Sequence, residues 1–483
     1  HVQLYVHTYA GPDREDIARV EGHGPVTEDW VRNLLGPHAR FTIRPVLDLA
    51  GQAPVDGGKT MRFESAATRL EDWFVTRALP LWADAGIDAA GGFYESLDSA
   101  GAPVPGRRRV RVQCRQIHTF TEAARRGWFP RGDAIAAKGF DRLLATAVPN
   151  DGARGCVHAL HEDGRVDQHL RDLYDQAFLL LACAARINAG DKRALTVANN
   201  TLSFLDREFA SPFGGFREND RGGHPRRQNP HMHLFEALLA LSAATGDAGV
   251  LDRAHAIEAL FRAKFYDARA GALREFFNDD WSLIDTVSDR IEPGHMAEWV
   301  ALIDRYERQT GEKRGGLKKA LYEAADSRRI PGEPFLPDLA MLNVRPAAAR
   351  RRLWPQTELL RAASILGQEP DAATIIKALF GTYFAVDKEG LWTDEFDAAG
   401  DPLGLGLLGI GSRHLGGGGR GGPGGLGGGR ARSRAGARRR GASGARRSAG
   451  GLSRPRARRA RSRPSPRLPA RDADARWPSR RRA

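Results

Sequence analysis

Cysteine is scarce in this chain of 483 residues, and its spacing excludes two common uses of the residue. The three cysteines, Cys114, Cys156 and Cys183, lie far apart and form no Cys-x-x-Cys pair. An odd number of widely spaced thiols indicates neither a disulfide framework nor a thiolate zinc site. This usage is typical of a reducing compartment, so we expect a cytoplasmic protein.

Long apolar runs are also missing. The longest, AFLLLACAA at 177–185, is far shorter than the roughly 20 residues that a membrane-spanning helix needs. It predicts a buried helix instead, and we expect no membrane partner. The chain starts at His1 without a charged segment followed by an apolar one, which we interpret as an incomplete or processed N-terminus.

Acidic, aromatic and β-branched residues are nearly absent from residues 404–483. This segment holds 22 Arg and 2 Asp, no Lys or Glu, and no Phe, Tyr, Val or Thr. Its net charge is +20, and because the whole chain carries +14, residues 1–403 carry −6. Such a composition cannot nucleate a core, so we predict a disordered C-terminal tail.

Two interpretations of this tail are open. An Arg- and Gly-rich arm can bind nucleic acid, but such arms usually interleave aromatic residues, and Trp477 stands alone here. Alternatively, a GC-rich gene read in a shifted frame yields the same residues. We favour the frame shift, because the tail replaces an element that the repeat pattern requires; nucleic acid is then not an expected partner.

Residues 1–60 differ in pattern from the chain that follows. Short β-like runs such as VQLYVHTY alternate with Gly, Pro and Asp, whereas helical periodicity begins at Met61. Residues 19–56 resemble part of a mycobacterial HNH-endonuclease-associated repeat family, but the nuclease histidines do not follow. We predict an extraneous or accessory N-terminal segment, a main domain at 61–403 and the tail from 404 onward.

A weak repeat organises the main domain. Turns built on Gly, an aromatic or small residue, acids and a second Gly recur at spacings of 57–64 residues, and the clearest copies start at Gly91 and Gly390. Apolar residues at helical spacing predict helices at 62–79, 111–125, 171–186, 229–243, 249–265, 295–308 and 354–366. Repeats of this size bury their apolar faces by stacking. Six periods of two helices predict an all-α (α/α)6 toroid with a central cleft.

Two of the predicted inner helices carry a histidine and a glutamate three residues apart. EPGHMAEW contains His295 and Glu298, and QNPHMHLFEALLAL contains His233 and Glu236. Each motif has a Pro near the helix start, where a missing N–H is tolerated, and residues three apart share a helical face. Because histidine exchanges protons near neutral pH, two such helices converging on one pocket predict an acid/base site.

Five motifs in order resemble the N-acylglucosamine 2-epimerase family of sugar epimerases and isomerases, which includes mannose isomerase-like members. They are the two motifs above and RRVRVQCRQIHTFTEAARRGW at 108–128, RDLYDQAFLLLACAA at 171–185 and RLWPQTELLRAA at 352–363. The resemblance covers about residues 61–403. It implies an (α/α)6 barrel, without a redox cofactor, that moves a proton at the carbon next to a sugar carbonyl through an enediol or enolate.

The resemblance also implies roles for individual residues. His295 is the first candidate for a catalytic acid/base, with Glu298 one helical turn away to orient it or to bind a sugar hydroxyl. His233 would lie across the cleft, and Arg115 would donate to the carbonyl oxygen. The implied substrate-binding residues are Glu298, Glu236, Asn229, Tyr174, Trp354, Gln356 and Glu358.

Other interpretations of these residues are open. Arg115 can instead bridge helices, and Trp354 can belong to the core; His118 and His231 are predicted to be structural. A metal site built from the two His/Glu pairs lacks a known ligand spacing, so no metal is predicted. An inverting glycoside hydrolase on the same toroid would need two carboxylates about 6.5–9.5 Å apart. The identity of the sugar and the formation of a homodimer are left open.

One departure from the family concerns the last helix. Members carry a second catalytic histidine on the final inner helix, shortly after the turn matched here by GLWTDEFDAAGDPL, and GLGLLGIGSRHLGGGG stands in its place. His414 lies at about the right position, in surroundings without a helical pattern. Our hypothesis is that a frame-shifted chain without its closing helix is unstable or nearly inactive.

Overall fold

The structure is a computed structural model that describes residues 62–148, 154–344 and 348–403 in full. The backbone of three further strands is described, namely β1 (Val2–Tyr9), β2 (Glu15–Gly22) and β15 (Leu407–Leu408). All of these residues belong to the first of two compact units, residues 1–414.

Some sequence-based predictions fall outside these ranges. The run VQLYVHTY forms β1, which pairs antiparallel with β2. Nearly all of the stretch that resembles the HNH-associated family, His414 and the expected closing helix lie outside the described residues. The same holds for the predicted tail apart from the backbone of β15, which pairs antiparallel with β3 (Ser96–Leu97).

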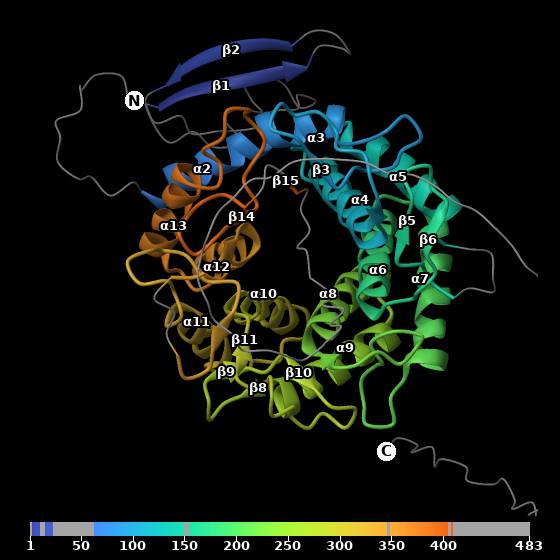
Figure 1. Ribbon diagram of the computed structural model, residues 1–483. Coiled ribbons are helices and arrows are strands. Elements are labelled where there is room, and N and C mark those ends of the chain that lie inside the picture. Colours follow the sequence, from blue (N-terminus) through green and yellow to red (C-terminus); the bar gives the residue numbers. More distant parts are fainter. Residues whose placement is uncertain are drawn as a thin grey trace, which may run out of the picture. The chain divides into compact units, whose positions relative to one another are not determined.

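Twelve α-helices form two layers in the described part of the chain (Figure 1). The inner helices are α4 (Val110–Arg125), α6 (Leu173–Asn188), α8 (Gln228–Thr245), α10 (Pro293–Thr310) and α12 (Leu353–Ile365). The outer helices are α2 (Phe63–Trp73), continued through a π-helical turn into α3 (Leu79–Ala85), and α5 (Gly132–Thr146), α7 (Lys192–Phe204), α9 (Ala248–Leu260), α11 (Leu317–Asp326) and α13 (Glu369–Gly381). Neighbouring inner helices pack in chain order, and α13 packs against α2. The predicted α/α toroid is confirmed.

Helix α10 shows how the sequence sets helix bounds. Pro293 occupies the first turn, where its missing N–H removes no helical hydrogen bond. The helix ends at Gly311, which adopts the left-handed conformation at φ 76°. Gly246 ends α8 in the same way at φ 69°. A residue with a Cβ is strained in this conformation. Glycine has no Cβ and adopts it without strain, so both helices end at a glycine.

Short strands hold the inner-helix starts at one rim. The pairs are β4 (Arg108–Arg109) with β5 (Ala159–Leu160), β7 (Arg226–Arg227) with β10 (Phe276–Phe277), β11 (Arg290–Ile291) with β12 (Ala340–Met341), and β13 (Arg351–Arg352) with β14 (Glu395–Phe396). The other strands are β6 (Val166–Gln168), which pairs with β5, and β8 (Tyr266–Asp267), which pairs with β9 (Ala272–Leu273). In each rim pair the first strand leads into an inner helix and the second belongs to the next repeat.

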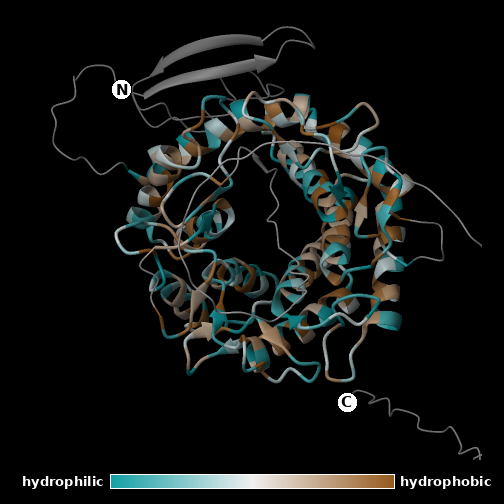
Figure 2. Ribbon diagram, viewed as in Figure 1, coloured by the Kyte–Doolittle hydropathy of each residue, from teal (hydrophilic) through white to brown (hydrophobic). Residues whose placement is uncertain are grey.

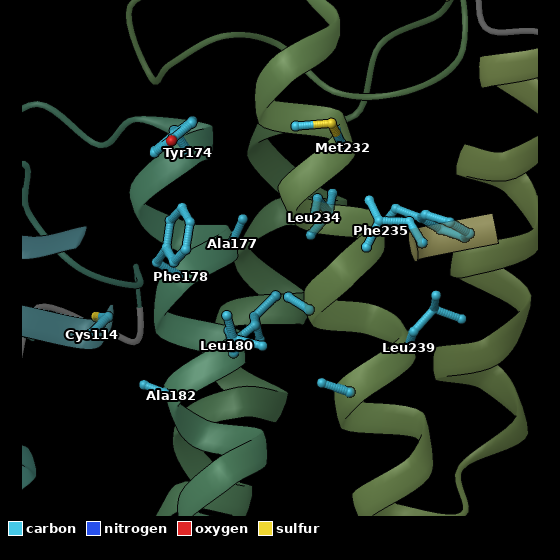
Figure 3. Close-up of a cluster of buried hydrophobic side chains, with 14 of the residues drawn as sticks. Cys114, Tyr174, Ala177, Phe178, Leu180, Ala182, Met232, Leu234, Phe235 and Leu239 are labelled. Atoms are coloured by element: carbon cyan, nitrogen blue, oxygen red, sulfur yellow. The ribbon is translucent and has the colours of Figure 1, made fainter. Parts of the chain in front are cut away.

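The core lies between the layers and between neighbouring inner helices. The run AFLLLACAA forms the middle of α6 and is buried throughout, which confirms the prediction for it. Figure 2 shows the apolar colouring along α6, and Figure 3 shows Phe178 and Leu180 of α6 beside Leu234 of α8. Each fully buried side chain of this size stabilises the fold by about 1.5–3 kcal/mol. Among the described helices, none is long and apolar enough to cross a membrane.

A side-chain clamp fastens three inner helices to their turns. Gln113, Gln176 and Gln356 each stand four residues after the N-cap, and each pairs with the backbone twenty residues earlier. The amide of Gln356 accepts from the N–H of Leu336 at 2.7 Å and donates to its carbonyl at 2.9 Å. The predicted pocket role of Gln356 is therefore wrong, because its side chain is fully buried and bonded to the backbone.

Candidate active site

A cavity of about 260 Å³ lies among the five described inner helices. Side chains from all five helices and from the turn before β14 line it. They are Arg115, His118, Thr119, Tyr174, Phe178, Leu181, Asn229, His233, Glu236, His295, Glu298, Leu353, Trp354, Thr357, Glu358, Arg361, Trp392 and Asp394.

Most of these residues occupy equivalent positions in their helices. The N-cap residues are Arg109, Asp172, Arg227, Glu292 and Arg352. The second residues after the cap supply Tyr174, Asn229 and Trp354; the sixth supply Arg115, Phe178, His233, Glu298 and Glu358; the ninth supply His118, Leu181, Glu236 and Arg361. At 3.6 residues per turn, these positions lie on one helical face. The cavity is therefore lined in layers by successive turns of the inner helices.

Nine of the ten predicted site residues line this cavity, and Gln356 is the exception. Arg115 is held by an aromatic wall from α6: its Nη2 donates to the Tyr174 hydroxyl at 2.9 Å, and its guanidinium lies 4.1 Å from the centre of the Phe178 ring. A guanidinium stacked in this way keeps its charge and a fixed direction.

His295 sits between two carboxylates at the start of α10. Its Nδ1 lies 3.1 Å from both carboxylate oxygens of Glu275, and its Nε2 lies 3.7 Å from Glu292. Burial lowers the pKa of His295, but Glu275 and Glu292 outweigh burial and raise this pKa to about 9. The Trp354 ring lies 5.1 Å away on the cavity side. His295 therefore carries a proton at neutral pH.

Of the two roles that the resemblance implied for Glu298, the contacts do not favour the orientation of His295; binding of a sugar hydroxyl stays a prediction. Its carboxylate lies 3.6 Å from Nδ1 of His233 on the neighbouring helix, whereas Nδ1 of His295 faces Glu275. Burial and the nearby Glu358 and Glu236 raise the pKa of Glu298 well above its usual range. Glu298 therefore contacts His233, although it lies one turn after His295 in α10.

His233 lies against two aromatic rings as well as carboxylates. Its Nδ1 is 3.4 Å from Glu236, and the rings of Tyr174 and Phe178 lie 4.8 and 4.7 Å from the imidazole. Burial lowers the pKa of His233 to about 4, against the opposing effect of Glu236. His233 is therefore neutral at neutral pH and can accept a proton.

The floor of the cavity holds carboxylates and a guanidinium. Burial raises the pKa of Glu358, although Arg361 lies 3.5 Å away and opposes this effect. The pKa of Glu236 stays below its usual range, because the hydrogen bond with His233 and the charge of Arg361 outweigh burial. These groups offer both donors and acceptors to sugar hydroxyls.

Several residues of the site were not predicted from the sequence. His118 was predicted to be structural but lines the cavity, because it stands nine residues after its N-cap, as Glu236 and Arg361 do. Asp394 and Glu275 come from turns and were not singled out. Alignment of the inner helices on their N-caps would have identified His118 and Arg361 from the sequence.

His231 is structural, as predicted. Its Nε2 accepts from the N–H of Phe216 at 3.0 Å, and its Nδ1 lies 3.0 Å from the carbonyl of Arg227. Burial lowers its pKa to about 3, which keeps it neutral. It stands four residues after the N-cap of α8, at the position that the clamping glutamines occupy in α4, α6 and α12.

Two groups in the described part of the chain have the spacing of metal ligands. They are His233, Glu236 and Glu298, and Glu275, Glu292 and His295, each with its ligand atoms within 4.8 Å of one another. Each group holds one histidine and two carboxylates. In both groups Nδ1 of the histidine already faces a carboxylate, so the same atoms also explain a proton-transfer site.

Known proteins of one family are similar to this chain in sequence. The sequence profile of the N-acylglucosamine 2-epimerase (GlcNAc 2-epimerase) family matches residues 92–406. A mannose-6-phosphate isomerase of Rhizobium meliloti (strain 1021) is 35% identical over 357 residues, which cover 69% of this chain and 90% of that protein. A D-mannose isomerase of Thermobifida fusca is 28% identical over 329 residues, which cover 62% and 80%.

Solved structures share the fold. A D-mannose isomerase superposes with a TM-score of 0.65 at 18% identity, covering 71% of this chain and 94% of that one. The cellobiose 2-epimerase of Bacillus thermoamylovorans B4167 gives 0.64 at 20% identity, covering 72% and 95%. With the family match over most of the toroid and a relative at 35% identity, the chain belongs to the N-acylglucosamine 2-epimerase family and is an isomerase that acts on sugars.

Proposed function

We propose that the protein interconverts a free aldohexose of the mannose type and the corresponding ketose, by moving a proton between C2 and C1 through an enediol. One observation carries the proposal: the pKa of His295 is raised to about 9 and that of His233 is lowered to about 4 within one cavity. Surroundings that separate two pKa values in this way favour an acid and a base role. Relatives named mannose isomerase support the aldose–ketose direction.

The proposed steps balance within the sugar itself. In the open-chain aldose, neutral His233 removes the C2 proton while protonated His295 gives a proton to the C1 carbonyl oxygen. The enediol then gains a proton at C1 and loses the proton of the C2 hydroxyl. Overall, the C2–H and O2–H bonds break and the C1–H and O1–H bonds form, so no outside oxidant or reductant is consumed. Arg115 stabilises the charge that develops on oxygen.

Epimerisation at C2 uses the same enediol and is the second outcome of the proposal. It requires that the proton return to C2 from the opposite face. A cellobiose 2-epimerase of Dictyoglomus turgidum, 25% identical over 252 residues, supports this alternative. The product distinguishes the two outcomes, since isomerisation gives a ketose and epimerisation gives a second aldose.

The charges in the cavity favour an unphosphorylated sugar. Two guanidiniums line it, Arg115 and Arg361, and Arg361 faces Glu358, Glu236 and Glu298. No surplus of positive charge therefore remains among the described lining residues for a phosphate dianion. We expect turnover of mannose and little turnover of mannose 6-phosphate, although the relative from Rhizobium meliloti is named for the phosphate.

A glycoside hydrolase is the competing enzyme class. In each His/carboxylate group the ligand atoms lie within 4.8 Å of one another, so neither group by itself supplies an inverting pair, whose carboxylates lie about 6.5–9.5 Å apart. Nucleic-acid binding through the Arg-rich tail concerns residues outside the described ranges. Salt-dependent binding that is lost on removal of residues 404–483 would support that alternative.

Incubation of the full-length protein with D-mannose in deuterated water tests the proposal. We expect fructose that carries deuterium at C1, and loss of its formation in His295→Asn and His233→Asn. His161→Asn, at an exposed histidine, is the matched control. Absence of exchange with mannose, N-acetylglucosamine and cellobiose would overturn the proposal, and release of reducing ends from a glycan without exchange would favour the hydrolase.

The state of the cysteines supports a reducing compartment. Cys114, Cys156 and Cys183 are all free and buried, and burial raises the pKa of each thiol. We therefore retain the cytoplasm as the proposed location.

A further inference from the structure

Carboxylates in the rim turns have a recurring partner in this fold. In three repeats a turn carboxylate accepts both from the backbone N–H and from Nε of the arginine at the N-cap of the following inner helix. The pairs are Glu95 with Arg109, Glu218 with Arg227 and Asp338 with Arg352. These contacts fix the helix starts and are structural.

Glu275 occupies the same place in the turn before α10 but has a different partner. Its carbonyl accepts from Gln228, the first residue of α8, just as the carbonyl of Glu218 accepts from Leu173, the first residue of α6. The N-cap of the following helix is Glu292, however, where three other repeats have arginine. The carboxylate of Glu275 therefore faces His295 instead of an N-cap guanidinium.

A buried chain of hydrogen bonds fixes Glu275 in this position. Trp299 donates from Nε1 to the amide oxygen of Gln228 at 3.1 Å, and the Gln228 amide donates to Glu275 at 2.9 Å. Both oxygens of Glu275 then lie 3.1 Å from Nδ1 of His295. The four side chains are at most 3% exposed, so solvent does not screen the contact.

We propose that Glu275 is the positioning residue for His295: its carboxylate accepts the Nδ1–H, keeps the imidazole charged and turns Nε2 toward the sugar. The proposal rests on the proposed function, in which His295 donates a proton. A carboxylate that holds one ring nitrogen of a histidine fixes which tautomer the other nitrogen presents.

The other charged groups around His295 do not duplicate this contact. Glu292 lies on the Nε2 side at 3.7 Å, and Glu298 faces His233 at 3.6 Å. Arg352 and Asp338, from β13 and the turn before β12, act on Glu292. Glu275 is thus the carboxylate that contacts Nδ1 of His295.

Glu275→Gln tests the proposal in the full-length protein, with Glu218→Gln as the matched control. Both glutamates are 3% exposed and occupy equivalent turn positions. Histidine titration by NMR, assigned with His295→Asn, should show the pKa of His295 falling by about 1–3 pH units in Glu275→Gln. The Glu218→Gln variant should keep that pKa but lose more thermal stability, because Arg227 is left without its carboxylate.

A structural role alone would give another result. If Glu275→Gln lowers the melting temperature without changing the titration of His295, the proposal is wrong. Glu275→Asp, which keeps the charge, should retain most of the raised pKa, and it serves as the second variant if Glu275→Gln does not fold. A fall of the His295 pKa to the ordinary histidine value in Glu275→Asp, which still places a carboxylate in this turn, would also contradict the proposal.

Activity separates this proposal from the proposed function. In Glu275→Gln, kcat for mannose should fall about 100-fold or more with little change in KM, and the loss of activity at high pH should begin at a lower pH. If the wild-type protein turns over no sugar but the NMR shift is present, the positioning role holds and the proposed function fails.

Discussion

His233 and His295 lie on neighbouring inner helices, each three residues before a glutamate, and yet their imidazoles face different partners. His233 is six residues after the N-cap of α8, whereas His295 is three residues after the N-cap of α10. His233 therefore lies further along its helix, beside the rings of Tyr174 and Phe178. His295 lies near the start of its helix, beside the turn residue Glu275 and the N-cap Glu292. The shared spacing therefore does not set the pKa of either histidine, which depends on burial and on the charged groups around each ring.

The largest expected effect comes from removing either histidine. His295→Asn and His233→Asn should each lower kcat/KM for mannose by about 10²–10⁴-fold, the usual contribution of a general acid or base. Steady-state assays would measure the loss, and circular dichroism would check the fold. Wild-type rates in one of the two variants would show that a single histidine performs both roles.

The pH dependence of activity should show the pKa values of His295 and His233 separately. His295 is protonated below a pKa of about 9, so kcat/KM should fall as pH rises through about 9. His233 is neutral above a pKa of about 4, so kcat/KM should also fall as pH decreases through about 4. A profile of kcat/KM between pH 3.5 and 10 measures both limbs. A profile that changes only once, near the ordinary histidine pKa, would contradict the difference in pKa between His295 and His233.

Substitution of Glu298 is expected to have a smaller effect on activity. Its raised pKa means that the carboxyl keeps a proton to higher pH than usual, and a protonated carboxyl resembles an amide in shape and hydrogen bonding. Glu298→Gln should therefore retain kcat within about 10-fold, whereas Glu298→Ala should lose more, because it leaves a buried polar neighbour unpaired. Equal losses in both variants would indicate that Glu298 acts as a charged group.

Gln356 should affect stability and leave the chemistry almost unchanged. Gln356→Ala leaves the backbone N–H and carbonyl of Leu336 unpaired, which should cost about 1–3 kcal/mol of unfolding free energy. Urea denaturation would measure the cost, and KM for mannose should stay within about twofold of wild type. Gln113→Ala, at the same clamp in α4, should behave alike. A large increase in KM in Gln356→Ala alone would restore the predicted pocket role.

Much of the fold was predictable because helix periodicity and the turn repeat are local signals. The segments that became α4, α6, α8, α10 and α12 were all predicted, with bounds shifted by a few residues. The outer helices α5, α7, α11 and α13 were expected only as the second helix of a period, and their positions were not located. Their helical state depends on packing against the inner layer, and packing is not visible in a local pattern.

The site was predictable where a motif carried it. Nine of ten predicted residues line the cavity, because the family motifs mark the N-terminal halves of the inner helices. Gln356 was misplaced because it stands two residues from Glu358 and Trp354, on another face of the same helix. The contact of Glu275 with His295 joins residues 20 apart across a turn, and no helical spacing predicts it.

Titration of the wild-type histidines by NMR tests the central claim most directly. His295 should lose its proton near pH 9, and His233 should gain one near pH 4. The His295→Asn and His233→Asn variants assign the two signals among the 14 histidines. Titration of both residues near the ordinary value of about 6.5 would contradict the account.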